Sequence, residues 1–382
     1  MQVQTVQLTV TEACNLDCVY CFAQNKSKRK MSSSLAREIA ARHLDADSPF
    51  DAIEFDFAGG EPLVALDVMQ DVVSFVHSRS WKKKHGFGFT TNGTLLNEKV
   101  KGWLSARDCI QFSISFDGTR EAHNANRSGS YDRAVAHVPW LLERCHRLGM
   151  TSSTKMTISP QTVGLIAEGV IHLHRLGFEE VNANVPYEDL WSDADRNGLL
   201  LNFASQLDLL VDYYDKNPSA RPPHLVRLPI HRLFSEPDDQ LAPRWCGSGR
   251  TMVCYDTNGE AYPCHRFVPM AVGKDRPYDG KAQLQPKTRL ELEAKSPCLD
   301  CPFVQACPSC LGFNWQVYGD PDVRTRFHCP FMLIQFKASA KLELLRLSAQ
   351  IERARAGREN ADVIGQLASR LDEAMVVMDL LA

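Results

Sequence analysis

The sequence lacks both a secretion signal and a membrane span. Its first residues, MQVQTVQLTVTEAC, contain no basic segment followed by an apolar one, and no run of 18 apolar residues occurs anywhere. We therefore expect a cytoplasmic protein that has no membrane partner and whose thiols stay reduced.

A large charge of one sign is also missing. Lys and Arg number 43 against 46 Asp and Glu, which gives a formal net charge of -3. Nucleic-acid binding relies on a basic surface, so this balance argues against a nucleic-acid partner. With 44% hydrophobic and 23% charged residues, the composition is that of a globular protein.

Cysteine, in contrast, is abundant, with 13 copies among 382 residues. In a reducing compartment, many cysteines indicate metal binding or catalysis rather than disulfides. The odd count also argues against a purely disulfide framework.

The first half of the chain alternates β-rich runs with helical patterns. The predicted strands are residues 3–11, 52–58, 86–91, 110–116, 152–158 and 180–185. Six such units predict an α/β fold with a parallel sheet, either doubly wound or a partial (β/α)6 TIM-like barrel. In both, ligands bind beyond the carboxyl ends of the strands, where the motifs below fall.

Four regions are expected along the chain: 1–216 as the partial barrel, 217–245 as a Pro- and Arg-rich linker, 246–329 as a cysteine-rich domain, and 330–382 as a helical tail. The cysteine-rich region shows little apolar periodicity. It should therefore be unable to build a core of its own, and bound metal should supply its folding energy.

Three cysteines follow the first predicted strand closely. Cys14, Cys18 and Cys21 form a C-x3-C-x2-C spacing. Three thiolates cannot complete a tetrahedral zinc site unless a distant residue joins them, which remains an alternative. They can hold three irons of a 4Fe-4S cluster and leave the fourth open to another ligand.

On this motif the chain resembles the radical S-adenosylmethionine (SAM) enzymes. The resemblance implies that the open iron binds SAM and that reductive cleavage yields a 5′-deoxyadenosyl radical, which abstracts a hydrogen from the substrate. It also implies an electron donor such as flavodoxin or ferredoxin.

Further motifs follow the later strands in the family's order. Gly59-Gly60-Glu61-Pro62 resembles the GGEP motif near the SAM amino group, where glycines let the backbone come close to a ligand. Asn92 lies in a Thr-Asn-Gly turn that is similar to the family's TNG turn.

Two motifs after the fourth strand complete the implied SAM site. Ser115 and Asp117 belong to an S-x-D-G stretch whose Ser the family places near the SAM ribose. Arg127 ends a segment similar to H-D-x-x-R, with Asn124 in place of Asp, and by resemblance it pairs with the SAM carboxylate. The two aromatic residues that flank the third cysteine, and that we expect at the adenine, are Tyr20 and Phe22.

Eight more cysteines lie in the C-terminal half and resemble the SPASM domain, which carries two auxiliary 4Fe-4S clusters. The resemblance implies an interleaved ligation. The first auxiliary set is Cys246, Cys254, Cys264 and Cys310; the second auxiliary set is Cys298, Cys301, Cys307 and Cys329. The last gap is C-x2-C where the family usually has C-x3-C, and two four-cysteine zinc sites are the alternative. The remaining Cys109 and Cys145 are expected to be buried small hydrophobes.

SPASM proteins mostly modify peptides, so the resemblance implies a radical SAM oxidoreductase that matures a ribosomally made precursor peptide. The expected product is an intrapeptide thioether, ether or carbon–carbon cross-link. An anaerobic sulfatase-maturating (formylglycine-generating) enzyme is the alternative, as are epimerisation and excision. In sulfatase maturases an Asp typically follows the auxiliary-cluster Cys, whereas here that residue is His265.

His265 is the candidate base, since its ordinary pKa of about 6.5 suits proton transfer near neutral pH. Because the first strand starts at Val3, we expect no leader-binding domain before it. The leader would bind elsewhere on the enzyme or through a separate leader-binding protein. A zinc scaffold and an electron-transfer protein are the competing classes, and metal content and SAM cleavage separate them from an enzyme.

Overall fold

The protein is described by a computed structural model covering residues 1–188, 190–191, 196–234, 246–273, 277–281, 284, 298, 301–357 and 360–382. Its strands are β1 (Val3–Thr11), β2 (Ala52–Gly59), β3 (Lys84–Thr91), β4 (Ile110–Ser115), β5 (Ser153–Thr157), β6 (Glu180–Asn184), β7 (Met252–Tyr255) and β8 (Ala261–Tyr262). Its helices are α1 (Ser33–Asp45), α2 (Leu66–His77), α3 (Glu98–Ser105), α4 (Arg120–Asn126), α5 (Tyr131–Val135), α6 (Val138–Arg147), α7 (Ile166–Arg175), α8 (Arg196–Lys216), α9 (Pro269–Val272), α11 (Leu311–Tyr318), α12 (Cys329–Ala356) and α13 (Ala361–Leu380). None of these helices is long and apolar enough to cross a membrane.

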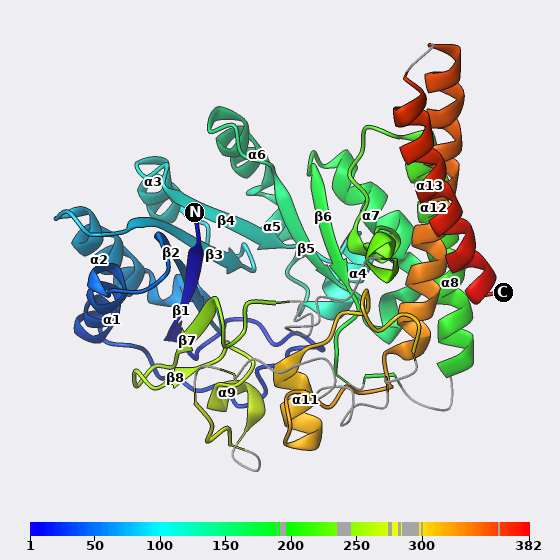
Figure 1. Cartoon of the computed structure of the whole chain (residues 1–382). Helices are drawn as coiled ribbons and strands as arrows, with labels where there is room; N and C mark the ends of the chain where they lie inside the picture. The colour runs from blue at the N-terminus through cyan, green and yellow to red at the C-terminus, as the bar shows by residue number, and fades with distance from the viewer. Residues whose placement is uncertain are drawn as a thin grey trace.

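The strands form one sheet in the order β6-β5-β4-β3-β2-β1-β7-β8. The first six follow one another in space as in sequence, and all pair in parallel. A doubly wound sheet would reverse its strand order near the middle, so the partial-barrel prediction is confirmed and the doubly wound alternative is wrong. The helices between the strands cover the outer face (Figure 1).

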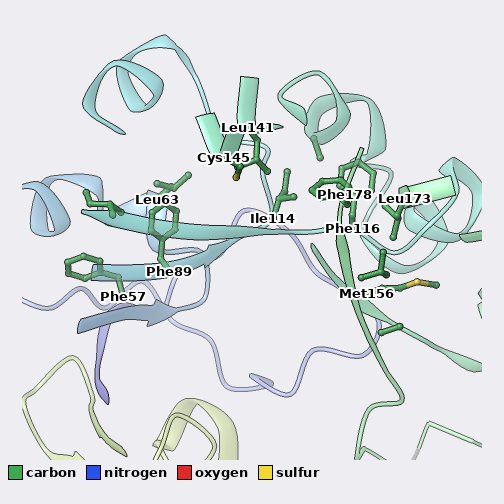
Figure 2. Packing of buried hydrophobic residues seen from close by; sticks show 14 of the residues in the cluster. Phe57, Leu63, Phe89, Ile114, Phe116, Leu141, Cys145, Met156, Leu173 and Phe178 are labelled. Atoms are coloured by element: carbon green, nitrogen blue, oxygen red, sulfur yellow. The ribbon is translucent and has the colours of Figure 1, made fainter. Parts of the chain in front are cut away.

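The two faces of the sheet differ in polarity because side chains alternate along each strand. The outward side chains, including Phe57, Phe89 and Ile114, are buried against the helices, and Leu141 of α6 packs in the same layer (Figure 2). The inward side chains are largely polar. This inner face, which we call the lumen, carries Gln7, Asp56, Ser113, Lys155 and Asn182, as the strand register shows.

The cysteine-rich region joins the barrel sheet. Strand β7 pairs in parallel with β1, from Thr5↔Met252 to Leu8↔Tyr255, and β8 pairs antiparallel with β7. The sequence predicted no strand here and no core. The expectation of a region without its own core is corrected, because Phe267, Leu284 and Leu311 form a small buried cluster there and β7 pairs with β1. That bound metal supplies folding energy to this region stays a prediction.

The stretch expected as a linker is packed over its described part. Leu225, Val226, Leu228 and Ile230 are buried, and the Leu228 amide donates to Ser339 Oγ of α12 at 2.9 Å. Residues 235–245 lie outside the described part of the chain. A flexible connector would leave these apolar side chains in water, so residues 217–234 act as a structural segment.

The predicted helical tail is a hairpin of α12 and α13, which lies along α8 (Figure 1). Lys341 of α12 contacts Asp208 of α8 at 2.8 Å, and Ala374 and Val377 of α13 are buried. The second helix, α13, begins at Ala361 after the Asn360 side chain caps its first turn. The tail therefore extends the helical layer outside the barrel.

Candidate functional site: a cysteine loop at the barrel rim

The three N-terminal cysteines share one loop directly beyond the carboxyl end of β1. Cys14, Cys18 and Cys21 are each partly exposed, and Cys14 borders an open cavity of about 530 Å³ with Asn15, Asp17 and Lys26 among its lining residues. Burial raises the pKa of the Cys18 thiol to about 11, with the nearby Arg127 opposing the rise. A thiol trio at an open cavity is a donor set that fits a cluster with one exposed iron.

The thiols do not converge on a single point. Among the described residues, which include all eleven proposed ligands, no group of three or more Cys, His, Asp or Glu side chains is placed to hold one metal ion. A zinc site needs its ligands within one small tetrahedron, at Zn–S distances of about 2.3 Å. A four-iron cluster takes one thiolate per iron and therefore tolerates wider spacing.

The glycines of the GGEP motif make room for the chain itself, and their expected proximity to SAM stays a prediction. A Cβ at Gly59 would lie 2.0 Å from the Thr11 carbonyl oxygen, and one at Gly60 would lie 2.4 Å from that of Ala13. The Gly59 φ of +139° is also one that other residues rarely adopt. The glycines thus seat the end of β2 against the start of the cysteine loop.

Replacing Gly59 with alanine is therefore expected to destabilise the protein by about 3 kcal/mol or more. The clash is with backbone, which a rotamer change cannot relieve. The urea midpoint at unchanged slope measures the effect. Gly102→Ala in α3 is the matched control, since its Cβ meets nothing within 4 Å and should be neutral or stabilising by up to about 1 kcal/mol. Equal midpoints for both variants would contradict the packing role.

Glu61 ties the GGEP motif to the Thr-Asn-Gly turn. Its buried carboxylate accepts from Thr91 Oγ1 at 2.7 Å, from the Asn92 amide at 2.8 Å and from the Leu63 amide at 3.2 Å. Burial raises the pKa of Glu61, and these hydrogen bonds lower it in part. Asn92 in turn donates to Asn15 Oδ1 of the cysteine loop at 2.9 Å. The motif residues thus hold one another in place.

Arg127, Asp117 and Tyr20 form a buried cluster beside the cysteine loop. Asp117 Oδ2 accepts from Arg127 Nε at 3.0 Å and from the Tyr20 hydroxyl at 2.5 Å. The Arg127 guanidinium carbon lies 5.4 Å from the centre of the Tyr20 ring. Because Asp117 engages Nε, the terminal nitrogens of the guanidinium are the ones left to meet an anion such as a carboxylate.

The other motif residues around Arg127 are structural. The buried His123 accepts from the Asp117 amide at 3.3 Å and contacts Ser130 Oγ at 3.0 Å, and burial lowers its pKa to about 4. Asn124 Oδ1 accepts from the Tyr131 amide at 2.9 Å. Ser115, at the carboxyl end of β4, is 8% exposed.

His265 extends from the C-terminal region to the lumen face of β1. Gln7 Oε1 lies 3.0 Å from His265 Nδ1 and accepts from the His265 amide at 3.1 Å, while Gln7 Nε2 donates to Asp56 Oδ2 at 2.9 Å. Burial, with Arg266 and Lys155 nearby, lowers the pKa of His265 to about 4. The Phe22 ring lies 5.3 Å from the imidazole, so His265 borders the cysteine loop.

The thiols of each expected auxiliary set influence one another electrostatically, and their interleaved ligation stays a prediction. Electrostatic influence links Cys264 to Cys254, Cys310 and Cys246, and it links Cys307 to Cys329, Cys298 and Cys301. Burial raises the pKa of Cys264 and of Cys307 to about 12. Buried thiols of high pKa must lose their protons to bind metal, so the sites couple metal uptake to proton release.

Tyr187 lies between the two auxiliary sets. Its ring centre is 6.0 Å from that of Phe313, three residues beyond Cys310, and 4.7 Å from that of His328, the neighbour of Cys329. Burial raises its pKa, as do Cys310, Cys307 and Cys246. The barrel thus contributes a side chain to the junction of both sets.

The last two cysteines differ from each other. Cys145 of α6 is buried, as predicted, but Cys109 is exposed, and its sulfur lies 3.7 Å from His77 Nε2. The prediction for Cys109 was wrong because it lies just before β4, where the sheet face is not yet covered.

The sequence did not reveal the polar residues that connect the barrel strands to the C-terminal region. Gln7 and Asp56 connect β1 and β2 to His265, and the buried Glu12 accepts from Arg29 Nε at 3.0 Å and from Thr257 Oγ1 at 3.1 Å. The only sequence signal for such a residue was that polar side chains, Gln7 among them, alternate with apolar ones in the first strand. The partners across β7 could not be inferred from that pattern.

Comparison with known proteins supports the resemblance to radical SAM enzymes. Residues 8–164 match the Radical SAM superfamily model. The chain is 24% identical to the mycofactocin maturase MftC of Mycobacterium ulcerans, over 84% of this chain and 90% of that protein. Matches to several other curated relatives span only 37% to 62% of their lengths.

Two solved structures share the fold. Native anSMEcpe with bound AdoMet and Cp18Cys peptide has a TM-score of 0.67 at 17% identity, over 91% of this chain and 99% of that one. Streptococcus suis SuiB bound to precursor peptide SuiA has a TM-score of 0.55 at 14% identity, over 86% and 76%. With the cysteine loop, the ordered motifs and the partial barrel, these matches show that residues 8–164 are a domain of the Radical SAM superfamily, which implies a 4Fe-4S cluster and SAM.

Proposed function

We propose that this enzyme matures a ribosomally made precursor peptide by forming an intrapeptide cross-link. The observation that carries the proposal is the meeting of the cysteine loop and the C-terminal region at one polar lumen, where His265 contacts Gln7 of β1 and the Phe22 ring of the loop. The anSMEcpe and SuiB structures each hold a peptide, which supports a peptide substrate here.

We assign three 4Fe-4S clusters, one on Cys14, Cys18 and Cys21 and one on each auxiliary set. When bound, the first cluster and SAM supply a radical that removes hydrogen from the substrate, and the auxiliary clusters supply an electron acceptor. Arg127, whose guanidinium lies over the Tyr20 ring of the cysteine loop, would hold a carboxylate of SAM with its terminal nitrogens. Phe22, Glu61 and Asn92 shape the loop around it.

His265 is the proposed proton acceptor. Gln7 Oε1 can only accept, and Gln7 Nε2 is engaged by Asp56, so Nδ1 of His265 must carry the proton. This leaves Nε2 with an unshared pair, the state that a base requires. The Gln7–Asp56 pair therefore selects the tautomer as well as the orientation of the ring.

The test is anaerobic incubation of the enzyme with dithionite, SAM and candidate precursor peptides taken from short reading frames that neighbour its gene. We expect 5′-deoxyadenosine together with a peptide that has lost a pair of hydrogens, and about twelve Fe per chain. His265→Asn should still produce 5′-deoxyadenosine while giving little cross-linked peptide.

Each competing class predicts a different outcome. Zinc in place of iron would refute the cluster assignment, and intact clusters without SAM cleavage would indicate an electron-transfer protein. A sulfatase-derived Cys or Ser peptide converted to formylglycine would favour the sulfatase-maturase alternative. His265 at the position where that class typically has Asp argues against it.

A further inference from the structure

Arg266 carries a buried guanidinium that is only partly used. Its Nη1 lies 2.5 Å from Glu188 Oε1, and its guanidinium carbon lies 4.7 Å from the centre of the Phe22 ring. Its Nη2 is buried and has no acceptor among the described residues. Glu188 Oε1 also has no aligned hydrogen bond among the described residues. The ion pair therefore leaves the hydrogen-bonding capacity of the Arg266 guanidinium unsatisfied. An unsatisfied buried donor on a cation is costly and indicates a missing partner.

Lys155 is a second cation near His265. Lys155 lies on the lumen side of β5, is exposed to the lumen, and donates to Thr90 Oγ1 at 2.8 Å. Arg266 and Lys155 are positive groups that act electrostatically on His265 within the part of the chain that the structure describes. Two cations therefore approach His265, one from the C-terminal region and one from the barrel.

The position of Arg266 is fixed from behind by α11. A Cβ at Gly312 would lie 2.3 Å from the Arg266 Cβ, so the helix that follows Cys310 packs directly against the arginine backbone. Phe22 supports the guanidinium face. A guanidinium held in this way loses little freedom when it binds, which favours recognition of a planar, bidentate partner.

We propose that Arg266 and Lys155 form a binding site for a carboxylate group in the lumen beside His265. Which molecule carries this carboxylate rests on the proposed function. An acidic side chain or the carboxyl terminus of the substrate peptide, bound here, would place a nearby residue of the peptide against His265. The carboxylate of SAM has the same chemistry, and the experiment below separates the two sources.

The test uses the anaerobically reconstituted holoenzyme and ligand-observed saturation-transfer NMR. The probes are N-acetylglycine and its neutral match N-acetylglycinamide. We expect binding of the acid at least about tenfold tighter than that of the amide, because charge-assisted hydrogen bonds are stronger than neutral ones. Arg266→Gln should remove this preference, and Arg266→Lys should keep part of it. The exposed Arg353→Gln in α12 should leave it unchanged.

Adding saturating SAM separates the sources. Retained acid binding assigns the site to a substrate carboxylate, whereas complete displacement assigns it to SAM. Equal binding of acid and amide, or an unchanged preference in Arg266→Gln, would overturn the proposal. Should Arg266→Gln lose iron, Lys155→Met tests the same site from the barrel and should weaken acid binding several-fold. Failure of SAM cleavage in the wild type would count against the proposed function instead, since carboxylate binding is measured without turnover.

Discussion

Replacing Cys14, Cys18 and Cys21 together with alanine is expected to abolish SAM cleavage while about eight of about twelve Fe remain per chain. All three thiols lie on one loop beyond β1, and none belongs to either auxiliary set. The variant removes the thiolates on which reductive cleavage depends and leaves both four-cysteine sets complete. Iron analysis and chromatographic detection of 5′-deoxyadenosine under dithionite give the two readouts.

Cys109→Ser is the matched control for this triple variant. Cys109 is an exposed cysteine outside all three sets, so its loss should change neither iron content nor cleavage. Loss of all iron in the triple variant would show that the auxiliary sets need the N-terminal loop to assemble. Retained cleavage would place the SAM cluster elsewhere.

Much of the barrel could be predicted because its signals are local. Alternation marked the strands, and their sequential order in the sheet follows from short right-handed crossovers. Helix boundaries were less predictable. The apolar pattern over residues 132–148 predicts a single helix, but the structure has two, α5 and α6. Pro139 lies in the first turn of α6, where its missing amide hydrogen costs nothing.

The gathering of the motif residues at the barrel rim was predictable, but the residues that support them were not. The cysteine spacings and the motif order indicated the thiols and Arg127, whose roles as ligands stay predictions. The roles of Gln7 and Glu12 depend on contacts with His265 and Thr257, more than 240 residues away, through the pairing of β1 with β7. The four residues of β7 carry no periodicity that would indicate a neighbour so distant in sequence.

The interleaving of the auxiliary sets gives the second large expected effect. Cys307 and Cys310 are separated by two residues, yet the interleaved assignment places them in different sets. Each single alanine variant should lose one cluster and retain about eight Fe. The double variant Cys307→Ala/Cys310→Ala should retain only about four, because two clusters are then incomplete.

The contrasting pair is Cys246→Ala/Cys310→Ala, whose two thiols belong to the first auxiliary set. Removing a second ligand from a cluster that is already lost should cost no further iron, so this double variant should also retain about eight Fe. Iron analysis of the two double variants thus reports which thiols share a cluster. Retention of about eight Fe when both Cys307 and Cys310 are replaced would place them on one cluster and contradict the interleaved assignment. The expected difference instead means that this short cysteine pair joins the two clusters at the junction where Tyr187 of the barrel is inserted.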